Sequence, residues 1–143
     1  MYLGDHPDRL CTISEVAQAH DISQPHLMKV TNRLSRAGWI ETIRGKNGGM
    51  RLAHAPSDIS IGAVVRDTEN DLALVECMND RPQQRCILVG RCALPRVLSG
   101  ALNKFMAHLD QFTLADLLEP AGNAPANQPD DPTVKPVSVH IAR

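Results

Sequence analysis

Apolar residues recur at helical spacing in two adjacent segments near the start of the chain. The first begins at Thr12, where the sequence Thr-Ile-Ser-Glu is typical of a capping box, and predicts a short helix. It ends near Asp21, a residue type that tolerates the left-handed conformation of a tight turn. The second follows Ser23, has a proline in its first turn and ends before Gly38. Its apolar stripe consists of Leu27, Val30, Leu34 and Ala37, and its polar face of Gln24, His26, Lys29, Thr31, Asn32 and Arg33.

Two short extended runs follow these helices, at residues 40–44 and 50–53. They flank a glycine-rich loop at 45–49 and predict a β-hairpin with a basic tip. Two helices, a tight turn and such a hairpin are typical of a winged helix-turn-helix, so the predicted fold class is mainly α with a β-hairpin wing. In this fold the second helix enters the major groove of DNA, and the wing lies along the backbone or the minor groove.

This arrangement assigns roles to the polar side chains of the second helix and the wing. The candidates for reading base edges are Gln24, His26 and Lys29, with Arg33 as a further DNA contact. The candidates for salt-dependent phosphate binding are Arg44, Lys46 and Arg51. The alternative for each is an ordinary solvent-exposed side chain.

The second half of the chain predicts two more helices and a tail. Ser60 is placed to cap a helix over residues 61–69. A broader apolar stripe runs from Leu94 to Phe112, and so long an apolar face in a small chain predicts a dimerisation helix and therefore a homodimer. Five of the ten prolines fall after residue 118, so we expect a disordered tail at 119–143. The expected domains are 1–60, which binds DNA, and 61–118, which dimerises.

Charge is distributed unevenly along the chain. Between residues 24 and 54 there are six Lys and Arg residues and one carboxylate, whereas the whole chain has a net charge of −1. A local basic patch can attract phosphates even on a nearly neutral protein, because salt screens the field beyond about 10 Å. No apolar run approaches the roughly 18 residues that a membrane span needs, and no secretory signal follows Met1. We therefore expect a cytoplasmic protein with no membrane partner.

Three of the four cysteines, Cys77, Cys86 and Cys92, lie in one turn-rich stretch. A disulfide would leave one thiol over and does not suit a reducing compartment, although a thiol redox switch stays open. A catalytic cysteine needs a base, and no histidine lies within the stretch. Zinc usually takes closer cysteine pairs and four ligands. An iron–sulfur cluster suits the wide spacing best, because a cluster is larger than a single ion. The fourth cysteine, Cys11, we expect to be a buried apolar residue rather than a ligand.

Four stretches carry a resemblance to a known family: residues 12–53, "IGAVVRDTENDLALVEC", "RCILVGRC" and "LDQFTLADLL". Together they resemble the winged-helix iron–sulfur regulators, and most closely the nitric-oxide-sensing repressors among them, from about residue 1 to 118. The resemblance implies a homodimer on palindromic operator DNA, with a cluster on Cys77, Cys86 and Cys92 of each subunit. It is compatible with a 2Fe–2S cluster, which we favour, and with a 4Fe–4S cluster. Nitric oxide would then attack the cluster and relieve repression of detoxification genes.

The chain departs from the family pattern at two places. Relatives begin with a helix containing an "FTDY"-like stretch, whose aspartate the resemblance implies as a fourth ligand from the partner subunit. Here "MYL" matches only the end of that helix, so we expect either an upstream start codon or a differently completed site. The second helix begins "SQPH" where relatives more often have "SRNH", so the preferred operator is expected to differ.

Overall fold

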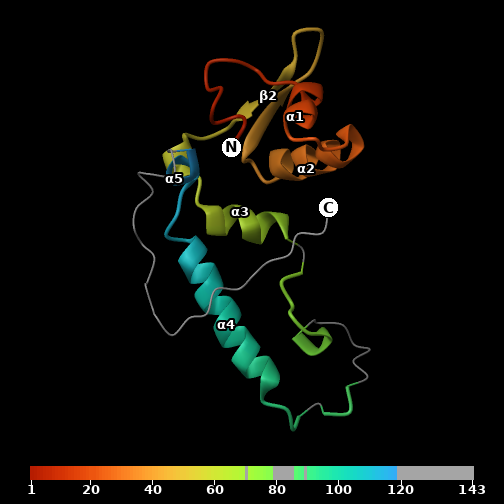
Figure 1. Cartoon of the computed structure of the whole chain (residues 1–143), viewed down its shortest axis with the longest axis vertical. Coiled ribbons are helices and arrows are strands. Elements are labelled where there is room, and N and C mark those ends of the chain that lie inside the picture. Colours follow the sequence, from red (N-terminus) through yellow and green to blue (C-terminus); the bar gives the residue numbers. More distant parts are fainter. Residues whose placement is uncertain (70, 79–85, 89, 119–143) are drawn as a thin grey trace.

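The computed structural model describes residues 1–69, 71–78, 86–88 and 90–118. In chain order, its elements are α1 (Ile13–Ala19), α2 (Gln24–Arg36), β1 (Ile40–Ile43), β2 (Gly49–Leu52), the 3-10 turn η1 (Pro56–Asp58), α3 (Ile61–Thr68), the 3-10 turn η2 (Glu76–Met78), α4 (Leu94–Leu109) and α5 (Leu114–Leu118). Figure 1 shows α1, α2 and the hairpin at one end of the molecule, with α3 below them and α4 leading away. This is the predicted order of a winged helix-turn-helix followed by a long helix.

The helix-turn-helix forms where local capping chemistry predicts it. The Glu15 amide donates to the Thr12 hydroxyl at 3.2 Å, and the Thr12 amide donates to the Glu15 carboxylate at 3.3 Å. This reciprocal pair confirms the capping box at the start of α1. Asp21 has a φ of 53° in the turn before α2, and Gly38 has a φ of 84° just after it, as predicted for both positions.

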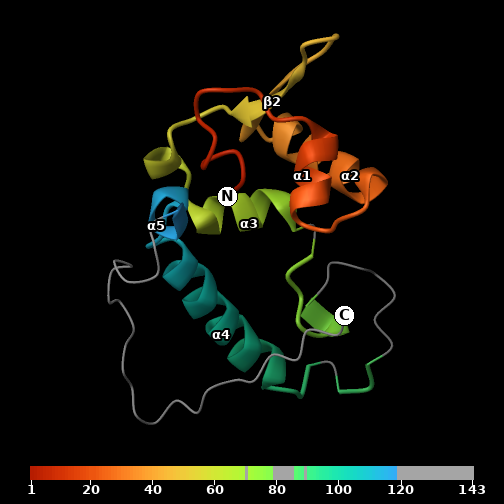
Figure 2. The ribbon, with the colours of Figure 1, turned by 45° about the horizontal axis from the view of Figure 1, so that its top comes forward.

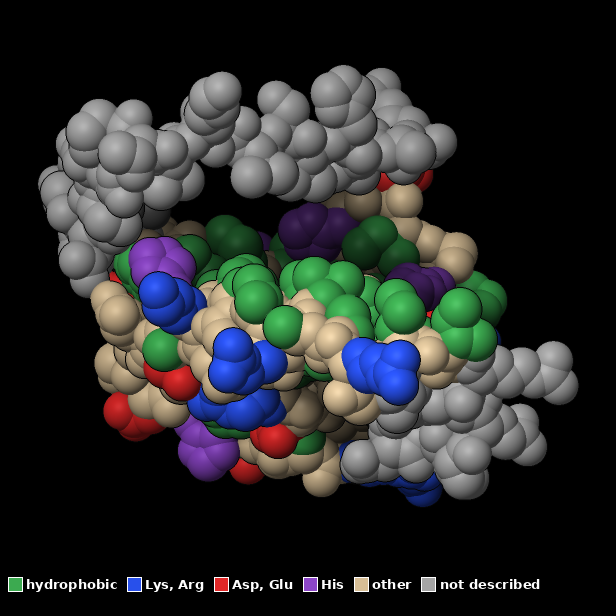
Figure 3. Space-filling model, turned by 90° about the horizontal axis from the view of Figure 1, so that it is seen from below, with side chains coloured by type: hydrophobic (Ala, Val, Ile, Leu, Met, Phe, Trp, Pro, Cys, Tyr) green, Lys and Arg blue, Asp and Glu red, His purple; other side chains and the backbone are tan. Residues whose placement is uncertain are grey.

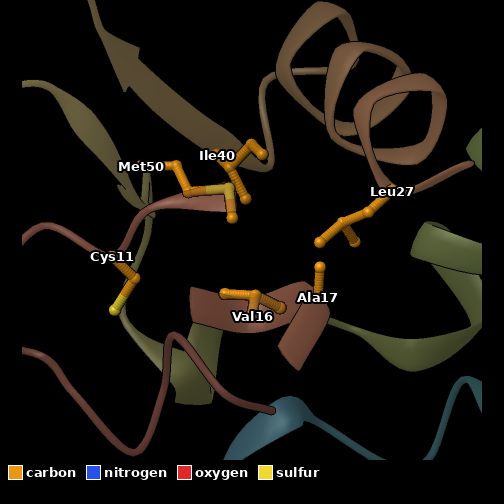
Figure 4. Close-up of a cluster of buried hydrophobic side chains, with 6 residues drawn as sticks. All are labelled: Cys11, Val16, Ala17, Leu27, Ile40 and Met50. Atoms are coloured by element: carbon orange, nitrogen blue, oxygen red, sulfur yellow. The ribbon is translucent and has the colours of Figure 1, made fainter. Parts of the chain in front are cut away.

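The hairpin pairs Ile40 with Leu52 and Ile43 with Gly49 in an antiparallel register. Met50 also exchanges two backbone hydrogen bonds with Cys11, at 2.9 and 2.8 Å, which joins the segment before α1 to the hairpin. The core lies between these elements and comprises Cys11, Val16, Ala17, Leu27, Ile40 and Met50 (Figure 4). Cys11 is fully buried, which confirms its prediction as an apolar core residue.

The buried line of α2 differs from the predicted stripe. Thr31, predicted on the polar face, is buried, while Val30 is 38% exposed and Ala37 is exposed. The line that faces the core therefore runs through Leu27, Thr31 and Leu34, which is also a helical spacing. Thr31 is tolerated there because its hydroxyl donates to the Met28 carbonyl at 3.1 Å and leaves no polar group unpaired.

Backbone hydrogen bonds join the connection between α4 and α5 to the residues at the start of α3. The Ser60 hydroxyl caps α3, as predicted, by accepting from the Ala63 amide at 3.4 Å. The Ile61 amide donates to the Phe112 carbonyl at 3.0 Å, and the Leu114 amide donates to the Ile59 carbonyl at 2.9 Å. These bonds fix the end of α4 and the start of α5 against the entry to α3.

Most of α4 is not covered by the rest of the chain. Met106 is its one buried residue, whereas Leu94, Val97 and Phe105 are each more than half exposed. Figure 3 shows hydrophobic side chains gathered across the face of the molecule seen from below. In the described residues, no helix has the length and apolar character needed to cross a membrane. The predicted tail, 119–143, lies outside the described residues.

Candidate nucleic-acid interface and thiol site

The polar face of α2 presents the residues predicted to read bases. Gln24, His26 and Lys29 are all exposed on the first two turns of the helix. Gln24 is also tied to the preceding helix, because its amide nitrogen donates to the Ser14 hydroxyl at 3.2 Å. The start of α2 therefore presents one side chain that is held in place and two that extend into solvent.

Arg33, the fourth candidate on α2, lies in a different environment. Its guanidinium donates a hydrogen bond to the backbone carbonyl of Thr68, the last residue of α3. A cation at the C-terminal end of a helix is favoured there by the helix dipole. In this conformation Arg33 links two helices of the same chain, which was not expected from its position on the polar face.

The three cations of the wing differ in whether they have an ion-pair partner among the described residues. Arg51 lies opposite Glu41 in the hairpin register and forms an ion pair with it at 2.7 Å. Arg44 and Lys46 are exposed in the loop and have no ion-pair partner among the described residues. Gly45, between them, has a φ of 117°, a conformation that favours glycine. Arg44 and Lys46 therefore carry the unpaired positive charge of the wing.

A groove of about 500 Å³ lies between α2 and α3, beside the predicted base-reading residues. Its lining includes His26, Lys29 and Arg33 from α2, and Val64, Thr68 and Glu69 from α3 and its end. The groove thus has cations on one side and, on the other, the C-terminal end of a helix followed by a carboxylate. Opposite charges across the groove favour contact between α2 and α3.

The three clustered cysteines lie around one hollow. Cys77 is in η2 and half-buried, while Cys86 and Cys92 are exposed in the segments before α4. All four cysteines of the chain are free thiols. Cys77, Cys86 and Cys92 line a cavity of about 610 Å³ together with apolar side chains that include Leu74, Leu88 and Leu94. The fold therefore places three thiols, separated by up to fifteen positions in the sequence, around the same open hollow.

The donor set fits an iron–sulfur cluster in its chemistry. Soft thiolates in an apolar surrounding are the ligands that such clusters take. Within the part of the chain that the structure describes, no group of three or more His, Cys, Asp or Glu side chains is arranged to hold a single metal ion. Burial raises the pKa of the Cys11 thiol, which makes that cysteine a poor ligand or nucleophile.

One contact between the residue before β1 and the end of α3 was missed by sequence reasoning. The Trp39 indole nitrogen donates to the Asp67 carboxylate at 2.9 Å, joining the residue before β1 to the last turn of α3. The two residues are 28 positions apart, so no local pattern signals their contact. The signal available was that Trp is the chain's single tryptophan and that its indole needs an acceptor when partly buried.

Comparison with known proteins agrees with this geometry. The family model Rrf2, described as an iron-dependent transcriptional regulator, matches residues 1–120. The HTH-type transcriptional regulator NsrR of Halalkalibacterium halodurans is 50% identical over 119 residues, which cover 82% of this chain and 81% of that protein. The regulator of the same name from Bacillus subtilis is 45% identical over 116 residues, covering 81% and 79% respectively.

Solved structures show the same fold. T. potens IscR is 26% identical, with a TM-score of 0.62, and the match covers 81% of this chain and 74% of that one. CymR, the global cysteine regulator of B. subtilis, is 24% identical with a TM-score of 0.59, covering 80% and 82%. The likeness thus extends over the winged helix-turn-helix and the helices that follow it.

Proposed function

Because the chain belongs to the Rrf2 family of transcriptional regulators, we propose that it is a repressor that senses nitric oxide through an iron–sulfur cluster and so controls genes of nitric oxide detoxification. The chain is a DNA-binding transcriptional regulator of winged helix-turn-helix type rather than an enzyme. The signal, the cluster and the target genes are the parts that we propose.

DNA recognition is assigned to α2 and the wing. His26 and Lys29 are exposed and free to reach base edges in the major groove, and Gln24 is held beside them by Ser14. Arg44 and Lys46 in the hairpin loop supply phosphate contacts, which displace counterions and make affinity depend on salt. Arg51 contributes less, because its charge is already shared with Glu41.

The cluster is assigned to Cys77, Cys86 and Cys92, and the single observation that carries the proposal is that these three thiols line one hollow. Their thiolates would hold the cluster, and the apolar side chains around them would limit the access of water. When bound, the cluster supplies iron that nitric oxide can attack. We favour a 2Fe–2S cluster. Along the chain, Cys77 follows α3 after residues 69–76, and Cys92 comes just before α4.

The partner of the chain is a second copy, joined through α4. The exposed apolar side chains of α4 are of the kind that a homodimer interface buries. A two-fold dimer would place two α2 helices on a palindromic operator, about one helical turn of DNA apart.

The assignment of the thiols is tested by replacing each of them with serine. We expect Cys77→Ser, Cys86→Ser and Cys92→Ser each to lower bound iron and acid-labile sulfide after anaerobic purification. The matched control is Cys11→Ala, which removes the buried cysteine and should leave the iron content unchanged. If all three serine variants retain a full complement of iron and sulfide, the assignment is wrong. Zinc without iron or sulfide in the unaltered protein would instead support a zinc site.

A further inference from the structure

Two consecutive residues at the end of α3 are bonded to the DNA-binding unit. Asp67 accepts from the Trp39 indole at 2.9 Å, and the carbonyl of Thr68 accepts from the Arg33 guanidinium. Arg33 is in the last turns of α2, and Trp39 lies just before β1. These two contacts, which we call the α3 clasp, therefore connect the end of α3 to both sides of the turn that follows α2.

The α3 clasp lies where the chain leaves toward the first thiol. Eight residues, 69–76, separate Thr68 from Cys77. The last thiol, Cys92, is followed almost at once by α4, which begins at Leu94. In Figure 2 α3, α4 and the segment that carries Cys77 (green) form three sides of a triangle. The stretch that contains the three thiols, residues 77–92, thus lies between the end of α3 and the start of α4 in the sequence.

The remaining corner of this triangle is held firmly. Arg66 on α3 donates two hydrogen bonds to Asp110 at the end of α4. Gly62 lies so close to Asp110 that an added Cβ would be 2.0 Å from its carboxylate. Since α3 and α4 are fixed together at this corner, a change in spacing among the thiols would displace the free ends of the two helices, and the α3 clasp lies at the free end of α3.

We propose that Trp39, Asp67 and Arg33 are positioning residues that transmit the state of the three-thiol site to the recognition helix α2. This inference rests on the proposed function, because it assumes that a bound group holds the thiols together. While the thiols are held, the end of α3 stays in place and the clasp keeps α2 and the start of β1 aligned. When they are released, the end of α3 shifts, both bonds of the clasp are lost together, and α2 leaves its binding orientation.

The Trp39–Asp67 bond of the α3 clasp can be removed without changing a residue assigned to DNA or to the thiols. The Trp39 indole is a donor only, so Trp39→Phe deletes the bond while keeping a smaller aromatic ring at the position. Asp67 is exposed, so Asp67→Ala removes the acceptor with little effect on packing. Asp67→Asn keeps an acceptor oxygen at the same place and serves as the conservative variant.

The test measures a ratio rather than an affinity. Operator binding is titrated with the cluster-loaded and cluster-free forms of the full chain. The dissociation constant of the cluster-free form divided by that of the loaded form measures the coupling between the two sites. We expect Trp39→Phe and Asp67→Ala to lower this ratio by about 2- to 30-fold, the range by which such linking residues change coupling. Asp67→Asn should keep it near the value of the unaltered chain. The visible absorption of the loaded variants should not change.

Matched controls separate the possible outcomes. Arg44→Ala should weaken binding of both forms equally and leave the ratio unchanged. A ratio near one for the unaltered chain would contradict the proposed function itself. A large ratio in the unaltered chain that persists in Trp39→Phe and Asp67→Ala would overturn this inference and leave the proposed function standing. Thermal unfolding of the same samples shows which variants are folded, and Asp67→Ala, being at the surface, decides the matter if Trp39→Phe is unstable.

Discussion

The carboxylate of Asp110, at the end of α4, accepts two hydrogen bonds from Arg66 of α3, 44 positions earlier in the chain. The pair lies beside Gly62, whose lack of a side chain allows α3 to approach the end of α4 closely. Both members are nearly half exposed, with side-chain accessibilities of 46% and 41%. The close packing at Gly62 therefore contributes more to this corner than the ion pair does, because exposed ion pairs contribute little.

Substitution of Gly62 by alanine should destabilise the fold. The new Cβ would lie 2.0 Å from the Asp110 carboxylate and 3.0 Å from its backbone nitrogen, so the Asp110 side chain must rotate away from Arg66 or the backbones of α3 and α4 must move apart. We expect a loss of about 1–3 kcal/mol in the free energy of unfolding, as for other cases of overpacking. Denaturation in urea measures it. Gly100→Ala is the control: a Cβ there has nothing within 4 Å, so that variant should be unchanged or slightly more stable.

Acid should weaken the attachment of the N-terminal segment to α1. The Arg9 guanidinium, the Tyr2 hydroxyl and the Thr12 amide all donate to Glu15, and they lower the pKa of Glu15 from 4.5 to about 2. Because this pKa is lowered in the folded state, the stabilisation is present above pH 4.5 and is lost as the pH falls toward 2.

Melting temperature measured between about pH 6 and about pH 2 tests this linkage, because that range spans the ordinary pKa of 4.5 and the lowered pKa of about 2. We expect Glu15→Gln to be less stable at pH 6 and to lose less stability on acidification than the unaltered chain. Arg9→Gln should act in the same direction, because Arg9 is the largest cause of the lowered pKa. An acid limb in Glu15→Gln as steep as that of the unaltered chain would show that other carboxylates dominate.

The wing cations should act on all DNA alike. Arg44→Ala and Lys46→Ala are each expected to weaken operator and unrelated DNA about equally and to reduce the salt slope by about 1. Arg51→Ala should have a smaller effect, because Glu41 already neutralises that charge. Fluorescence anisotropy across a salt series measures these slopes. A change of sequence preference in Arg44→Ala with an unaltered slope would contradict the placement of the wing.

The start of α2 should determine sequence preference instead. Gln24→Ala is expected to change which operator variants bind best while leaving the salt slope unchanged, because an amide contacts bases without releasing counterions. Selection from a pool of operator variants measures the preference. Ser14→Ala, which removes the hydrogen-bond partner of Gln24, should give a weaker change of the same kind.

The exposed face of α4 should be an interface between two copies. Phe105 is 53% exposed, and Phe105→Glu would place a charge within the proposed dimer contact. We expect this variant to sediment as a monomer and to bind a palindromic operator poorly. Asn103→Glu changes an exposed residue on the opposite face of the same helix and should remain dimeric. Identical sedimentation of the two variants would place the interface elsewhere.

Local chemistry predicted the elements of the fold, whereas contacts between distant segments were not predictable. The capping box at Thr12 and the turn at Asp21 depend on neighbours within a few residues, so the sequence contains the whole signal. The burial of Thr31 depends on how α2 rotates against α1 and β1, which periodicity alone does not determine. Clustering in the sequence singled out the three thiols, but Trp39 and Asp67 meet only because α3 crosses beside α2.

The most direct measurement is a titration with nitric oxide under anaerobic conditions, recording visible absorption and operator binding on the same sample. Our account predicts that the purified protein contains iron and sulfide, and that absorption and operator affinity change together as nitric oxide is added. It also predicts that Cys77→Ser shows neither change. A colourless protein that contains no iron or sulfide, and whose operator affinity does not change when nitric oxide is added, would contradict the account.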